Sequence, residues 1–161
     1  MKYFIVDAFA DSLFKGNPAG VCLLDHELPD NVMQSIAFEN NLAETAFLLK
    51  KDGKNILRWF TPELEIDLCG HATLASAFIV MTYIEPSLNA IDFETKSGTL
   101  GVIRSGDIFT MNFPSRMPEP TDTPPLLEEA LGCRILETHK SRDLLVLTDS
   151  QETVSKLKPN I

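Results

Sequence analysis

The stretch from Leu64 to Tyr83, LEIDLCGHATLASAFIVMTY, constrains the fold of this chain more than any other. Its beginning, Leu64 to Leu68, alternates apolar residues with carboxylates, and a period of two is typical of a β-strand. From Gly70 to Ile84 the chain then has 15 residues without Asp, Glu, Lys or Arg, and apolar residues fall on every side of a helix. Such a helix must be enclosed, and it is shorter than the roughly 20 residues that cross a membrane. We therefore predict a helix buried at the centre of the fold.

The join between this strand and this helix, Cys69-Gly70-His71, is the first candidate site. Glycine has no side chain to block a ligand, and the first N–H groups of a helix have no partner within it. The positive end of the helix dipole favours a carboxylate or a phosphate. The same field would lower the pKa of the Cys69 thiol if the thiol lies in the first turn. The sequence therefore predicts an anion site at this turn.

Glu44 lies in another alternating segment, Leu42 to Leu49, which we predict to be a strand. Because side chains alternate across a strand, Glu44 shares its face with the apolar residues Leu42 and Ala46. Burial among aliphatic groups disfavours a charged carboxylate, and this suits a group that takes up and returns a proton. A glutamate that reaches solvent from a strand end is the alternative, and the residues themselves leave both interpretations open.

The remaining segments predict strands and helices joined by turns. We expect strands at 2–9, 20–24, 56–60, 90–95, 99–103 and 108–113, the last three as an antiparallel meander, and a helix at 29–40. Five prolines between Pro114 and Pro125 are typical of a linker. We therefore place a first domain at 1–116, a linker at 117–125 and the incomplete beginning of a second domain at 126–161. Helices at 126–131 and 151–157 and strands at 135–139 and 144–147 are expected in that second part.

Charge and cysteine content exclude several classes of protein. The net charge is −9 and no Lys/Arg cluster occurs, which argues against nucleic acid and anionic membranes as partners. The three cysteines, Cys22, Cys69 and Cys133, are far apart, and the chain opens without the apolar run of a signal peptide, so we expect a reduced cytoplasmic location. The histidines and cysteines lack the paired spacings of metal sites, and no glycine-rich phosphate motif occurs. We therefore predict neither a metal nor a cofactor.

Five blocks of the sequence resemble, in their order and spacing, the phenazine-biosynthesis PhzF-like isomerase family. They are Asp7-Ala8-Phe9, Gly16-Asn17-Pro18-Ala19-Gly20-Val21, Asn41-Leu42-Ala43-Glu44-Thr45-Ala46-Phe47, Arg58-Trp59-Phe60-Thr61-Pro62 and Leu68-Cys69-Gly70-His71-Ala72-Thr73-Leu74-Ala75. The family has the α+β diaminopimelate-epimerase-like fold, in which each of two similar halves wraps a curved, mostly antiparallel sheet around a central buried helix. The resemblance implies this fold here, with the start of the second half near the end of the chain.

The resemblance also implies a function and a set of site residues. The function is that of a cofactor-independent isomerase or epimerase that moves a proton on a small carboxylate-bearing metabolite, in an active site between the two halves. Glu44 is then the catalytic acid and base, and Gly70, His71 and Asn17 bind the substrate. Asn17 in a plain turn and a purely structural His71 are the alternatives.

Cys69 and Asp67 are further candidates for the site. Related racemases of this fold place a catalytic thiol just before an equivalent glycine, so a thiol-based racemase using Cys69 is an alternative function, although a buried cysteine is also a good core residue. Asp67 orients His71 or caps the central helix. Two departures from the family matter: Ala43 stands where many members have serine, and the Asp-Pro-x-Thr-Gly-Ser block of the second half has no counterpart before Ile161.

The missing second half leads to an expectation about partners. The strands expected at 135–139 and 144–147 would expose unpaired edges and an apolar face if they stood alone. We therefore expect them to be completed by other polypeptide, either the remainder of the same protein or a second copy, with a homodimer as the expected assembly. A catalytically inactive remnant that still binds small anions is the alternative to an enzyme.

Overall fold

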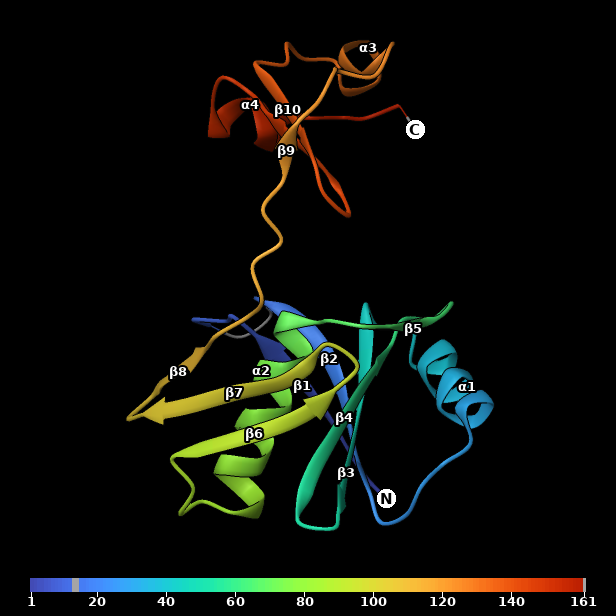
Figure 1. The fold of residues 1–161 in the computed structure, drawn as a ribbon, viewed down its shortest axis with the longest axis vertical. Helices are drawn as coiled ribbons and strands as arrows, with labels where there is room; N and C mark the ends of the chain where they lie inside the picture. Colours follow the sequence, from blue (N-terminus) through green and yellow to red (C-terminus); the bar gives the residue numbers. More distant parts are fainter. Residues whose placement is uncertain (13–14, 161) are drawn as a thin grey trace. The chain divides into compact units, whose positions relative to one another are not determined.

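The structure is a computed structural model that describes residues 1–12 and 15–160. The chain divides into two compact units, and the boundary falls between Phe113 and Pro114. The elements of the first unit are β1 (Lys2–Ala8), β2 (Asn17–Leu24), α1 (Asp30–Asn40), β3 (Glu44–Lys51), β4 (Lys54–Phe60), β5 (Glu65–Ile66), α2 (Gly70–Ile79), a π-helical turn (Val80–Ile84), β6 (Ala90–Thr95), β7 (Gly98–Ser105) and β8 (Ile108–Met111) (Figure 1).

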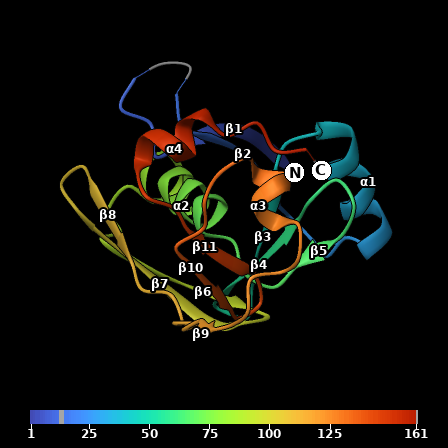
Figure 2. The same cartoon turned by 90° about the horizontal axis from the view of Figure 1, so that it is seen from above.

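The described strands of the first unit form one sheet, in the order β1-β2-β3-β4-β6-β7-β8, with β5 paired to β4. Sequence neighbours such as β3 and β4 are antiparallel hairpins, whereas β2 with β3 and β4 with β6 are parallel pairs. A parallel pair needs a crossover connection, and α1 and α2 lie in these two connections. Figure 2 shows the strands curving around α2. The predicted α+β fold, with a curved, mostly antiparallel sheet around a central helix, is confirmed.

The central helix begins at Gly70 as predicted, but its winding changes near its end. Ala72, Ala75 and Ala77 are fully buried, and their small side chains allow the strands to pack close to the helix. From Val80 the helix widens, because the N–H of Glu85 donates to the carbonyl of Val80, five residues earlier. The strand expected at 64–68 is shorter than predicted, since β5 has two residues. Within residues 1–12 and 15–160, no helix is both long and apolar enough to cross a membrane.

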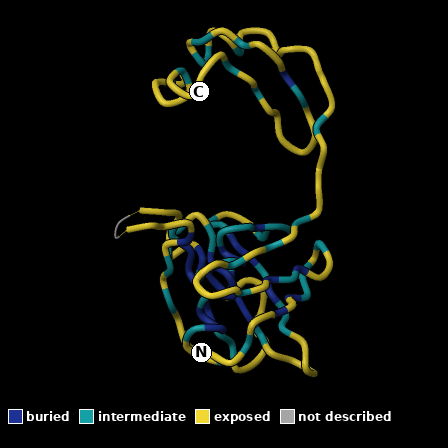
Figure 3. The backbone as a smooth tube through the Cα atoms, turned by 90° about the vertical axis from the view of Figure 1, so that its left-hand side faces the viewer, coloured by how far each residue is buried: buried dark blue, intermediate teal, exposed yellow. Residues whose placement is uncertain are grey.

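The core of the first unit is divided between two faces of the sheet. Trp59, Leu57 and Phe93 belong to the cluster that includes the buried side of α2. Phe47 and Phe60 belong to a second cluster with residues of α1, and their rings meet edge to face at 5.4 Å between centroids. In Figure 3 the buried segments of this unit run through the sheet and the central helix. Both faces of the sheet are therefore covered by packed side chains.

The second unit contains β9 (Glu119–Pro120), α3 (Leu127–Leu131), β10 (Glu137–Lys140), β11 (Leu144–Leu147) and α4 (Gln151–Lys156). Its sheet has the order β11-β10-β9, and all neighbours are antiparallel. β9 lies in the segment expected to be a linker, so part of that proline-rich stretch pairs with β10. Among the described residues of this unit, Thr138 alone is buried.

Candidate active site

Glu44 lies at the edge of the sheet where β2 and β3 begin. The two strands are parallel neighbours, and Ala19 of β2 is opposite Glu44. One residue further, a Cβ atom on Gly20 would lie 3.1 Å from Oγ1 of Thr45 and 3.2 Å from the ring of Tyr3. The absence of a side chain at Gly20 therefore allows β2 to pack closely against Thr45, at the start of β3.

Glu44 and His71 come together at the N-terminus of α2. Oε2 of Glu44 lies 3.2 Å from Nε2 of His71, and their side chains are 18% and 10% exposed. Although this is an ion-pair distance, neither atom has a hydrogen-bond partner of acceptable geometry within the described part of the chain, and both atoms are buried. Buried polar atoms are normally hydrogen-bonded, so this pair is available to a further group.

Cys69 contacts the opposite side of the same imidazole. Its Sγ lies 3.5 Å from Nδ1 of His71, and the residue is 5% exposed. Burial raises the pKa of the Cys69 thiol to about 12; the N–H groups of Ala72 and His71 act in the opposite direction, and the charge of Glu44 raises the pKa further. The prediction that the helix terminus lowers this pKa is wrong, because desolvation outweighs the helix field. The thiol is therefore protonated at neutral pH.

Gly70 is the first residue of α2, and the packing of the protein around it does not require a glycine at this position. Its φ is not in the left-handed region, and a Cβ atom built there meets no atom within 4 Å. Cys69 before it is the N-cap residue, in an extended conformation, and its side chain makes no capping hydrogen bond. The space beside Gly70 is therefore open at the end of the helix that favours anions.

Asn17 begins β2, the parallel neighbour of the strand that carries Glu44, and Asp67 lies two residues before Cys69 in the chain. Asn17 is the exposed first residue of β2, two positions before the residue opposite Glu44, which corresponds to about 7 Å along a strand. Asp67 precedes α2, but Cys69 occupies the N-cap position. The backbone carbonyl of Asp67 accepts a hydrogen bond of 2.8 Å from the Ser97 hydroxyl. This contact ties the segment before the helix to the turn between β6 and β7.

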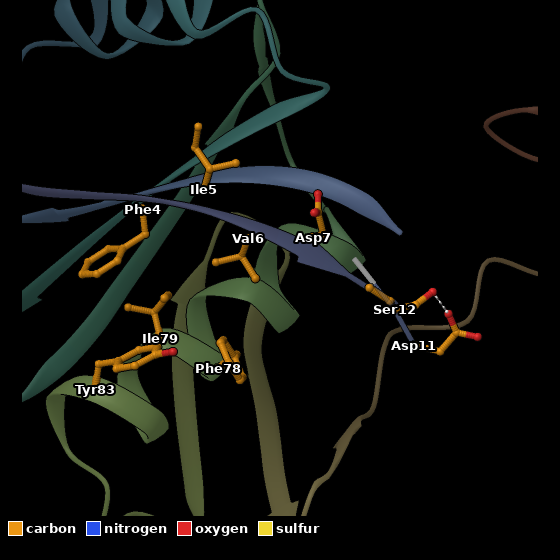
Figure 4. A pocket seen from close by; sticks show the side chains of 10 residues that line it. Phe4, Ile5, Val6, Asp7, Asp11, Ser12, Phe78, Ile79 and Tyr83 are labelled. Atoms are coloured by element: carbon orange, nitrogen blue, oxygen red, sulfur yellow. Dashed lines mark hydrogen bonds between the residues drawn. The ribbon is translucent and has the colours of Figure 1, made fainter. Parts of the chain in front are cut away.

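A cavity of about 690 Å³ lies elsewhere, between β1 and the end of the central helix. Figure 4 shows Phe4 and Val6 pointing toward Ile79 and Tyr83, while Ile5 points away. The lining is mainly apolar and does not include the Glu44 cluster. The candidate site residues therefore lie at the helix terminus and do not line this cavity.

The cluster offers a carboxylate, an imidazole and a thiol from two elements. A carboxylate beside an imidazole can exchange protons with a substrate, and the helix end can hold an anionic group. The ligand atoms of Glu44, Cys69 and His71 also lie within 4.8 Å of one another, close enough to hold a metal ion. The resemblance placed Glu44 and His71 in one site, but local sequence patterns indicated neither their contact nor the hydrogen bond from Ser97, because both depend on strand pairings that no local pattern reveals.

Comparison with known proteins gives a consistent result along nearly the whole chain. Residues 6–161 match the family described as Phenazine biosynthesis-like protein (PhzC-PhzF). An uncharacterized isomerase from Pseudomonas aeruginosa is 51% identical over 160 residues, which cover 99% of this chain and 62% of that protein. The sequence similarity to this family is therefore not limited to the five blocks but also includes the segments between them.

Solved structures share the fold. The crystal structure of a PhzF family protein from Enterococcus faecalis has a TM-score of 0.89 and 48% identity, and the match covers 98% of this chain and 61% of that one. A predicted epimerase from Pseudomonas aeruginosa, 22% identical, matches with a TM-score of 0.77 over 99% of this chain and 63% of its own, which shows the fold alone. The chain thus spans about three fifths of the length of these relatives.

Proposed function

This chain belongs to the phenazine biosynthesis-like protein family, and we propose that it is part of an isomerase or epimerase that transfers a proton on a small carboxylate-bearing metabolite without a cofactor. Glu44 is the acid and base in this proposal. His71 positions or relays the proton, and the backbone at Gly70 holds the substrate carboxylate. Asn17, at the same edge of the sheet, is a candidate for a further contact to substrate.

The observation that carries the proposal is the Glu44–His71 pair. Its two facing atoms are 3.2 Å apart, buried, and without other hydrogen-bond partners among the described residues. A catalytic base must reach the proton that it removes, and a carboxylate whose oxygen has no fixed partner is free to do so. A structural carboxylate at this depth would instead be expected to accept hydrogen bonds from the backbone.

The open space at Gly70 supports the choice of a carboxylate as the group that is bound. The helix end favours negative charge, and its N–H groups stabilise the further negative charge that develops on a bound carboxylate when the proton of the adjacent C–H bond is removed. The net charge of the whole chain is −9, so attraction of an anion must come from this local field. The site is therefore proposed to be selective for small anions that reach the helix terminus.

The alternative in which Cys69 is the base has weaker support. With a pKa of about 12, its thiol carries very little thiolate near neutral pH. A glutamate mechanism does not need ionisation of the thiol, and Cys69 then contributes packing and contact with the imidazole. The raised pKa therefore favours Glu44 over Cys69.

The test is solvent-deuterium incorporation in the intact protein. A panel of small carboxylates with a C–H bond next to the carboxylate is incubated in D₂O and followed by NMR. Glu44→Gln, which keeps the shape of the side chain, is expected to abolish exchange, whereas Glu63→Gln, on an exposed glutamate, leaves it unchanged. Cys69→Ala is expected to retain exchange.

Three results would change the assignment. Undiminished exchange in Glu44→Gln would remove Glu44 from the mechanism. Loss of exchange in Cys69→Ala, with the fold retained, would favour the thiol mechanism. Carboxylate binding by calorimetry without any exchange in the unsubstituted protein would identify an inactive remnant that binds anions.

A further inference from the structure

We propose that Glu44, Cys69 and His71 form a binding site for a thiophilic divalent cation such as Zn²⁺. The ligand atoms of these three residues lie within 4.8 Å of one another. They combine a carboxylate, a thiol and an imidazole, which are the three kinds of protein ligand that Zn²⁺ uses most. The spacing of Cys69 and His71 alone does not predict this site, because Glu44 comes from a different strand.

Each distance from the imidazole, taken separately, equals the spacing of two ligands on one zinc ion, although the two distances involve different ring nitrogens. With Zn–N and Zn–O distances of about 2.0 and 2.1 Å, a tetrahedral ion holds its nitrogen and oxygen ligands about 3.3 Å apart. Nε2 of His71 and Oε2 of Glu44 are 3.2 Å apart. A Zn–S distance of about 2.3 Å places sulfur and nitrogen about 3.5 Å apart, and Sγ of Cys69 is 3.5 Å from Nδ1 of His71.

One ion contacts only one nitrogen of an imidazole, so binding to all three residues requires the His71 ring to turn between Glu44 and Cys69. Such a turn gives up the 3.5 Å contact between Nδ1 and the Cys69 Sγ but breaks no hydrogen bond of Nε2, since that atom has no partner among the described residues. Water or a ligand fills the fourth position. The Cys69 thiol releases its proton to solvent on binding, which makes the affinity rise with pH.

The unpartnered atoms are a second observation in favour of a ligand. Oε2 of Glu44 and Nε2 of His71 are both buried, and the His71 side chain is nine-tenths buried. A hydrophobic surround strengthens a charged ligand set around a cation, because few waters compete for it. The consequence for catalysis, which rests on the proposed function, is inhibition, because the ion occupies both groups that are proposed to move the proton.

The test is a titration of the 161-residue chain with Co²⁺, a spectroscopic substitute for Zn²⁺. Thiolate ligation gives a sulfur-to-cobalt charge-transfer band, which is expected in the unsubstituted chain, is lost in Cys69→Ala and is retained in Cys133→Ala. Glu44→Gln and His71→Gln are expected to weaken binding by about tenfold or more. His139→Gln is the matched control, because His139 contacts Glu137 at 2.9 Å in an exposed pair without a thiol.

Several outcomes overturn the proposal. They are the absence of the band, its persistence in Cys69→Ala, or equal affinity in Glu44→Gln and His139→Gln. If Cys69→Ala fails to fold, the near-isosteric Glu44→Gln variant still decides through its affinity. Since the cobalt spectrum does not depend on turnover, a failed deuterium-exchange assay with an intact band would reject the proposed function and leave the metal site standing.

Discussion

Residues 1–113 and residues 114–161 each contain a sheet and helices, but they differ in the side chains that these elements bury. The first unit encloses large residues such as Trp59, Phe47 and Phe93, each at most 1% exposed. In the second unit, β11 reads Leu-Leu-Val-Leu, yet Leu144, Leu145 and Leu147 are all exposed. Figure 3 shows the same contrast between the two parts of the chain.

The comparison teaches that regular backbone does not by itself make a stable domain. The helices of the second unit, α3 and α4, have 5 and 6 residues, too short to persist alone in water. Three short strands need a hydrophobic face packed on something to be stable. We expect the first unit to carry the cooperative unfolding of the chain, and the second to depend on other polypeptide.

The largest expected effect is the difference in unfolding free energy between truncating a large apolar side chain in the first unit and truncating one in the second. Phe93→Ala removes a fully buried ring and is expected to cost about 3–5 kcal/mol of unfolding free energy. Leu145→Ala, at a residue 56% exposed, is expected to change it by less than about 0.5 kcal/mol. Urea denaturation followed by far-UV circular dichroism reports on both units. Equal costs would break the comparison, because they would reveal a core in the second unit.

Association through the second unit is the next largest effect. Among the described strands, β11 pairs with β10 alone, so its other edge is available to another chain. We expect the 161-residue chain to self-associate, and Leu145→Lys to weaken this by about tenfold, or about 1.4 kcal/mol. Leu64→Lys, at an exposed leucine of the first unit, is the control. Light scattering coupled to gel filtration decides; a monodisperse monomer whose two units unfold together would contradict the prediction.

The loss of an ion pair is expected to lower the unfolding free energy more in the first unit than in the second, but this difference is smaller than those above. Arg58 forms two hydrogen bonds with Glu65, at 2.7 and 2.8 Å, and their side chains are 26% and 14% exposed. Glu65→Gln is expected to cost roughly 1 kcal/mol at pH 7, at the top of the range for ion pairs near the surface. Glu152→Gln breaks an exposed pair of the second unit and is expected to have no measurable effect.

The pH dependence provides the check on this pair. The hydrogen bond from Arg58 lowers the pKa of Glu65 from its ordinary value of 4.5, against the opposing effect of burial, and Lys96 lowers it further. A pKa lowered by folding contributes stability above pH 4.5, and this contribution is lost as the pH falls through the folded value. The difference between Glu65→Gln and the unsubstituted protein should therefore disappear in acid, and a difference that persists there would have another cause.

The smallest effect on stability is expected at Gly70. Gly70→Ala meets no atom and is expected to raise the unfolding free energy by about 0.5 kcal/mol, because it restricts the unfolded chain. Carboxylate binding should nevertheless be lost, since the new methyl group fills the open space. Gly132→Ala, at a left-handed glycine that ends α3, is the control, expected to weaken that helix and leave binding intact. Unchanged affinity in Gly70→Ala would remove this position from the site.

Local patterns predicted the elements whose partners lie close in the sequence. Alternation predicted the strand that carries Glu44, with an error of two residues at each end, because strand ends depend on pairing rather than on pattern. The uncharged run after Cys69 predicted the central helix. Its widening at Val80 was not predicted; in this turn the Met81 carbonyl accepts a hydrogen bond from Arg104, which lies two strands further along the chain.

The resemblance to a family supplied what the patterns could not. The residues around Glu44 left a solvent-exposed glutamate and a catalytic one both open, and the family motif favoured the catalytic one. Neither approach predicted the protonation of Cys69. The helix terminus was visible in the sequence, but the depth at which the sheet encloses the thiol was not, and that depth decides its pKa.

The parallel pairing of β2 with β3 has a consequence for the order of folding. Ala19 and Glu44 are opposite each other in space but 25 positions apart in the chain, with α1 between them. Hairpins such as β3 with β4 close short loops and form early, whereas a parallel pair must wait until distant segments meet. Glu44 and His71 therefore become neighbours only when the hairpins dock on the central helix. We therefore expect the site to form after the local hairpins, late in synthesis or refolding.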